Sequence, residues 1–116
     1  MLRTMAAAAA ATIGVLSATD VRAQGSYPSK PITVIVPFAA GGPTDVVARI
    51  IGEHMVRTLG QSLVVENIGG AGGTTGMTRL SQAAPDGYSI SVGNLGTLSA
   101  APALYPNLKY DGSVLT

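Results

Sequence analysis

Apolar and polar positions along the chain predict the order strand, helix, strand, helix, strand. Residues 32–36 are almost all β-branched, which is typical of a parallel strand covered on both faces. A helical pattern runs from Pro43 to Leu59, and Gly60 is its expected stop. The charged residues recur four apart on what we interpret as a solvated face: Arg49, Glu53 and Arg57. The apolar residues share another face: Val47, Ile50, Ile51, Met55 and Leu59.

The second half of the pattern is shorter and less regular. Residues 63–66 predict a short apolar strand, and a second helix is expected to begin near Thr74 or Thr75. Its sheet-facing side chains are expected to be Met77, Leu80 and Ala84. The turn sequence 85–87 precedes a period-two alternation over residues 88–92, which predicts the third strand, and a helical turn is expected at residues 100–104. Strands that alternate with helices indicate an α/β fold with a parallel sheet in three layers.

Residues 1–23 have the order of a secretory signal peptide. Arg3 supplies the positive charge, residues 5–16 supply the short apolar stretch, and Val21 and Ala23 are the small residues that a signal peptidase reads. We therefore expect cleavage after Ala23 and export. An uncleaved membrane anchor is disfavoured because the apolar stretch is shorter than the roughly 20 residues that a spanning helix needs. The chain has no cysteine, which excludes disulfides, a lipidated terminus and thiolate metal ligands.

Charge and aromatic content exclude other classes of function. Residues 24–116 carry five basic and five acidic side chains, so the net charge of +1 comes from the segment before them. There is no basic run, one phenylalanine and no tryptophan. Binding to nucleic acid or to a membrane surface therefore lacks an electrostatic basis, and nucleic-acid bases would find few aromatic platforms on which to stack.

Two glycine-rich loops stand at the same place in successive strand–helix units, at residues 37–45 and 69–76. Each leaves the carboxyl end of a predicted parallel strand and opens a helix, where backbone amides and the helix dipole favour an anion. We predict that the loops meet over one ligand; the alternative for the second loop is a flexible turn that only permits tight helix packing. The candidate ligand-binding residues of the first loop are Phe38 as an apolar wall, the amides of Ala39, Ala40, Gly41 and Gly42, and the hydroxyl of Thr44. Those of the second loop are Gly70, Ala71, Gly72, Gly73 and Thr74.

Two polar residues beside these loops have two interpretations each. Asp45 falls near the third position of the first helix, where its carboxylate could bond back to the helix cap or could receive an ammonium or hydroxyl group of the ligand. Capping is favoured because an acid beside an anion site lowers affinity unless its charge is already occupied. Asn94 follows the third strand, and it either reaches the pocket or forms a turn between Gly93 and Gly96.

Motifs of cofactor binding and catalysis are missing from the sequence. The second loop lacks the G-x-G-x-x-G spacing of dinucleotide-binding loops, and neither a phosphate-binding Gly-Lys-Ser/Thr nor a Gly-x-Ser-x-Gly elbow occurs. His54 is the single histidine, and we interpret it as a residue at the rim of the core. The carboxylates are scattered and offer no acid–base pair. We therefore predict no catalytic residue, no metal and no cofactor.

Six short motifs follow one another along the chain: YPSKPI from Tyr27, VPFAAGGPTD from Val36, LGQ from Leu59, VEN from Val65, GAGG from Gly70 and PDGY from Pro85. This series resembles the extracytoplasmic receptors of tripartite tricarboxylate transporters, the Bug-type solute-binding proteins. The resemblance implies a two-lobed, flytrap-like periplasmic receptor, of which residues 24–116 are the N-terminal part of the first lobe and the second lobe is absent. It also implies a small carboxylate or related polar metabolite as ligand, a membrane permease as partner, a monomer at full length and no enzymatic activity.

Two positions depart from that family's pattern. Pro43 removes a potential amide, which bears on ligand choice, and the Ile68-Gly69 step replaces one that often contains proline, which alters the stiffness of the loop. Since closure needs a second lobe, we expect this fragment alone to bind weakly or not at all. The alternative function is an α/β enzyme whose catalytic residues lie in the missing C-terminal part, but the export signal and the missing nucleotide motifs favour the receptor.

Overall fold

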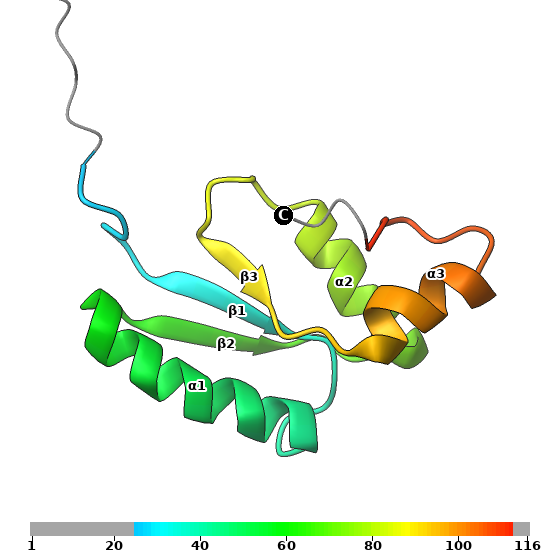
Figure 1. Ribbon diagram of the computed structural model, residues 1–116, viewed down its shortest axis with the longest axis horizontal. Helices are drawn as coiled ribbons and strands as arrows, with labels where there is room; N and C mark the ends of the chain where they lie inside the picture. The colour runs from blue at the N-terminus through cyan, green and yellow to red at the C-terminus, as the bar shows by residue number, and fades with distance from the viewer. Residues whose placement is uncertain (1–24, 113–116) are drawn as a thin grey trace, which may run out of the picture.

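The computed structural model describes residues 25–112 and consists of a parallel sheet flanked by helices (Figure 1). The expected signal segment, with its cleavage after Ala23, lies outside these residues. The strands are β1 (Ile32–Val36), β2 (Leu63–Asn67) and β3 (Ser89–Ser91). The helices are α1 (Pro43–Leu59), α2 (Thr74–Ser81) and α3 (Ala101–Leu104), with a 3₁₀ turn, η1 (Ala71–Gly73), before α2 and a π-helical turn, η2 (Gly96–Ala100), before α3. Within residues 25–112, no helix combines the length and the apolar character needed to cross a membrane.

The sheet has the order β2–β1–β3, and both outer strands pair with β1 in parallel. Ile32 lies opposite Leu63 in one pair, and Thr33 lies opposite Ser89 in the other. Helix α1 packs on β1 and β2, whereas α2 packs on β1 and β3. Figure 1 shows the two helices on opposite sides of the sheet. The predicted α/β fold with a parallel, three-layer arrangement is therefore confirmed.

The central strand β1 forms the middle of the core. Four of its five residues, Ile32, Val34, Ile35 and Val36, are at most 3% exposed, although neighbouring residues of a strand point to opposite faces. The β-branched run of this strand is therefore covered on both sides, as its composition predicts. On one side Val34 and Val36 pack with Ala48 of α1, and partly buried apolar residues surround them: Phe38, Leu63, Val65, Ile90 and Val92.

Helix α1 has the predicted bounds but presents an unexpected face to the sheet. Its buried residues are Asp45, Ala48 and Gly52. The large aliphatic residues of the predicted apolar face point elsewhere, and Val47, Ile50 and Ile51 are 48%, 56% and 49% exposed. His54 is exposed as well, so its expected place at the rim of the core is wrong.

Helix α2 begins at Thr74, as predicted, but ends at Ser81. Met77 is buried and Leu80 is partly buried, whereas Ala84 is exposed beyond the helix, so its expected place toward the sheet is wrong. Pro85 disfavours a helical conformation at Ala84, the residue before it, which is consistent with a helix that stops short of Ala84.

Strand β3 is shorter than the predicted 88–92, although its pairing continues on both sides of it. Thr33 N donates to Tyr88 O at 2.8 Å, and Val92 N donates to Ile35 O at 3.2 Å. The last helical segment begins at Gly96 instead of residue 100. Leu104 ends it, as predicted.

Candidate functional site

Three segments meet at the carboxyl ends of the three parallel strands, where the arrows of Figure 1 point the same way. A β-carbon built on Gly69, after β2, would lie 3.7 Å from Ala39 N, after β1. One built on Gly73 would lie 3.2 Å from the Phe38 ring and 2.6 Å from the Thr97 methyl group in η2. The two glycine loops therefore lie in contact with each other, and η2 packs against the second loop. That the loops share one ligand stays a prediction.

The first loop contains a tight turn from Ala39 to Gly42. Gly42 N donates to Ala39 O at 3.2 Å, and Gly41 has a φ of 79°, which together are typical of a type II turn. This geometry explains why glycine stands at position 41, since the third residue of such a turn requires a positive φ. Gly41 and Gly42 use their N–H groups inside the protein, because Gly41 N donates to Asp45 Oδ2 at 2.8 Å. The amides of Ala39 and Ala40 make no hydrogen bond within residues 25–112, and both residues are exposed.

Asp45 lies under this loop and is 2% exposed. Its Oδ2 accepts from Gly41 N at 2.8 Å and from Arg49 Nε at 3.0 Å, and its Oδ1 accepts from Asn67 Nδ2 at 3.0 Å. The Arg49 hydrogen bond, with those from Gly41 and Asn67, lowers the pKa of Asp45 to about 2. The carboxylate is thus occupied by the protein, but it does not bond to the cap residue Gly42, so the expected helix-cap role is wrong: Asp45 holds Gly41, the residue before the cap.

Asn67 connects the first loop to β2. Its Nδ2 donates to Phe38 O at 3.2 Å as well as to Asp45, and its Oδ1 accepts from the Arg49 guanidinium at 3.3 Å. Sequence reasoning missed Asn67 and Arg49 as parts of the site. The four-residue spacing of Asp45 and Arg49 on a helix indicates that they can pair, but Arg49 also stands four residues before Glu53, and the sequence does not decide between the two partners. The contact with Asn67 joins residues 22 apart and leaves no local signal.

The second loop contains four successive residues with a positive φ: 125° at Gly70, 46° at Ala71, 66° at Gly72 and 91° at Gly73. This left-handed run explains why three of the four are glycine. Gly73 is buried and donates its N–H to Gly70 O at 2.9 Å, so it serves close packing. The amides of Gly70, Ala71 and Gly72 have no hydrogen-bond partner in the described part of the chain, and these residues are exposed just before the N-terminus of α2.

Two of the remaining candidate side chains, those of Thr74 and Asn94, form hydrogen bonds within the protein. Thr74 Oγ1 donates to Ala71 O at 3.0 Å. Asn94 Oδ1 accepts from Thr97 N at 3.1 Å, while Thr97 Oγ1 accepts from Asn94 N at 3.0 Å, so the two residues cap the last helical segment reciprocally. This cap explains the early start of that segment. Thr44 is half-buried in the first turn of α1.

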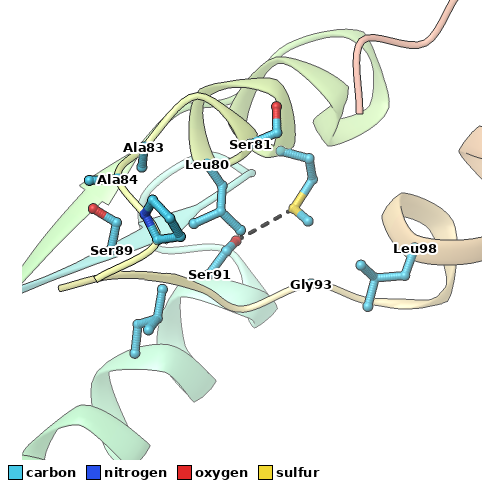
Figure 2. A pocket seen from close by; sticks show the side chains of 11 residues that line it. Leu80, Ser81, Ala83, Ala84, Ser89, Ser91, Gly93 and Leu98 are labelled. Atoms are coloured by element: carbon cyan, nitrogen blue, oxygen red, sulfur yellow. Dashed lines mark hydrogen bonds between the residues drawn. The ribbon is translucent and has the colours of Figure 1, made fainter. Parts of the chain in front are cut away.

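A cavity of about 390 Å³ lies away from the loops, between α2 and β3 (Figure 2). Its wall is largely apolar, with Leu80 and Leu98 among the lining residues, and it contains no charged side chain and none of the candidate residues. Ser91 Oγ points toward it but donates to Ile35 O at 2.8 Å and lies 3.5 Å from the Met77 sulfur (Figure 2). This cavity therefore does not suit an anion. Nor does the described part of the chain contain a cluster of three metal-ligating side chains.

Comparison with known proteins places the chain in a family. Residues 47–115 match the family described as "Tripartite tricarboxylate transporter family receptor". A protein from the TAR-I ttuE–ttuC′ intergenic region of Agrobacterium vitis is 53% identical over 89 residues, which are 77% of this chain and 25% of that protein. The solved periplasmic binding protein BugD is 56% identical with a TM-score of 0.71, over 74% of this chain and 28% of that chain. MatC from Rhodopseudomonas palustris, solved with bound malate, is 55% identical with a TM-score of 0.71, over 74% of this chain and 29% of that chain. The chain thus spans about a quarter of the length of such relatives.

Proposed function

The chain belongs to the tripartite tricarboxylate transporter receptor family, and we propose that it forms part of a periplasmic receptor that captures a small carboxylate. The carboxylate is held mainly by main-chain N–H groups of Ala39 and Ala40 in the first loop and of residues 70–72 in the second. The receptor then delivers its ligand to the membrane permease of the transporter. In this proposal it is a monomer, exported by the segment that ends at Ala23.

The observation that carries this proposal is the set of unpartnered amides at two touching loops. A hydrogen bond from a neutral donor to a carboxylate is stronger than one between neutral groups, and the N-terminus of α2 adds a favourable dipole. The malate in MatC, over half identical to this chain in the aligned region, supports a carboxylate as the chemical class. The members of the family are solute-binding receptors, so the alternative of an α/β enzyme gains no support.

We propose that Phe38 borders the ligand as an apolar wall and that Thr44, Thr74 and Asn94 lie at the edge of the site. The side-chain oxygen of Asn94 already accepts a hydrogen bond from Thr97 N, so the donor that Asn94 can offer to the ligand is its side-chain NH2 group. Because Gly41, Gly42 and Gly73 use their N–H groups internally, they shape the loops and leave recognition to their neighbours.

Calorimetry of the protein at its natural length, against dicarboxylates, aromatic acids and amino acids, tests the function. We expect one acid to bind tightly and to be recovered unchanged. Chemical turnover of that acid, or tight binding of a nucleotide in its place, would contradict the proposal.

The substitution Ala40→Pro tests the role of the amide. Proline suits the second position of a type II turn, so this change deletes one N–H group and preserves the turn. We expect affinity to fall by roughly 10- to 100-fold, since a hydrogen bond to a charged group is worth about 1.5–3 kcal/mol. Ala40→Ser keeps the N–H group and is the matched control, for which we expect little change. Equal affinities for the two variants would show that the Ala40 amide does not hold the ligand.

A further inference from the structure

We infer that Arg49 is a positioning residue of the proposed site, which cancels the charge of Asp45 beneath the first loop and thereby lets the loop amides accept an anion. The inference rests on the proposed function and extends it to a residue that need not touch the ligand. It explains how the negatively charged Asp45 can lie next to a site that binds a carboxylate ligand.

The contact geometry places the acid directly behind the proposed donors. Asp45 Oδ2 holds Gly41 N at 2.8 Å, and Gly41 follows Ala40, whose amide is one of the unpartnered donors. A ligand oxygen on the Ala40 amide would therefore lie roughly 6–8 Å from the Asp45 carboxylate, from the spacing of successive residues. At that separation two negative charges repel each other unless one of them is neutralised.

Arg49 supplies the neutralising charge. Its Nε lies 3.0 Å from the same Oδ2 atom, and its guanidinium also donates to Asn67 Oδ1 at 3.3 Å, which fixes its plane. Arg49 is the charged group that acts on Asp45 in the described part of the chain; the other two partners, Gly41 and Asn67, are neutral. Glu53, the other acidic residue on this helix face, forms its ion pair with Arg57, whose Nη2 lies 2.5 Å from Glu53 Oε1. Glu53 therefore does not compete with Asp45 for Arg49.

The alternative is that this pair only stabilises the start of α1. The two interpretations differ in what happens when the charge of Asp45 is removed as well. If Arg49 only holds the fold, its removal lowers affinity whether or not residue 45 is charged. If it neutralises Asp45, its removal leaves an uncompensated negative charge, and replacing Asp45 by asparagine removes that charge and restores affinity.

The test compares Arg49→Met, Arg49→Lys and the double variant Asp45→Asn with Arg49→Met in the protein at its natural length. Malate is the probe, and each affinity is divided by that of the unaltered protein at the same pH, which removes the effect of malate's own protonation. For Arg49→Met we expect about a tenfold loss at pH 8, from the Coulomb energy of two unit charges at this distance. Arg49→Lys and the double variant should bind nearly as well as the unaltered protein.

Two results would overturn the inference. One is a loss of affinity in Arg49→Met that is not rescued in the double variant. The other is an unchanged carboxyl titration of Asp45 in Arg49→Met, measured by carbon NMR without any ligand, where we expect the midpoint to rise. This second readout remains decisive if no acid binds the unaltered protein, a result that would reject the proposed function itself.

Discussion

Gly76→Ala is the substitution that we expect to damage the scaffold of the site most directly. Gly76 is buried in the first half of α2, where this helix crosses the ends of β1 and β2. A β-carbon at this position would lie 2.7 Å from Ile68 O, 2.8 Å from Pro37 Cα and 2.9 Å from Pro37 Cβ. These atoms belong to backbone or to a proline ring, so no flexible side chain can move aside. The helix itself must shift away from the two loops.

The magnitude follows from two opposing effects. Forcing an extra methyl group into a packed region costs about 1–3 kcal/mol and sometimes more, and the greater helix propensity of alanine returns about 1 kcal/mol. With three contacts below 3.0 Å we take the upper end of that range, so the free energy of unfolding should fall by about 2 kcal/mol. Gly52→Ala in α1 is the matched control, because a β-carbon there meets nothing within 4 Å. It should raise the free energy of unfolding by up to about 1 kcal/mol through propensity alone.

Urea unfolding followed by circular dichroism measures both variants against the unaltered protein. We expect shifts of opposite sign from the same chemical change in two helices of one fold. If Gly76→Ala proves as stable as Gly52→Ala, α2 does not pack against Pro37 and Ile68 as described, and the account of how the loops are positioned fails.

Two further predictions concern titratable groups. The pKa of Asp45 is about 2, below the ordinary value of 3.8, so the stability from its ionised form is present above about pH 4 and is lost as the pH falls toward 2. Asp45→Asn should make the free energy of unfolding depend less on pH in a urea unfolding series from pH 5 to pH 2, and an unchanged dependence would refute the assignment. Tyr110 donates its hydroxyl to Thr97 O at 2.6 Å and burial raises its pKa, so Tyr110→Phe should lower the free energy of unfolding by about 1 kcal/mol at pH 7. Because the raised pKa favours the neutral phenol in the folded state, the contribution of Tyr110 should be complete below pH 10 and disappear at higher pH, which an unfolding series from pH 9 to pH 11 would check.

The parts of the fold that the sequence predicted well depend on local patterns. The β-branched run of β1, the Pro43 start and Gly60 stop of α1, and the start of α2 each depend on residues within a few positions of one another. The place of the glycine loops followed from the rule that parallel strands end at one edge of the sheet. Those inferences needed no knowledge of distant contacts.

The errors come from contacts between distant elements or from competition between residues. The large apolar residues of α1 suggested its packing face, but the buried residues of the helix are Asp45, Ala48 and Gly52. Which amides stay free could not be predicted either, since Gly41 donates its N–H group to an Asp45 carboxylate that Asn67, on another strand, also holds. The sequence pointed to two loops that lie in contact in the structure but could not say which of their donors are available.

A structure of the natural-length protein with the acid selected by calorimetry tests the central claim most directly. We predict that the oxygens of one carboxylate group lie about 3 Å from the backbone nitrogens of Ala39 or Ala40 and of at least one residue in the range 70–72. A ligand held by side chains, with these nitrogens more than hydrogen-bond distance away, or one seated in the cavity between α2 and β3, would contradict the account.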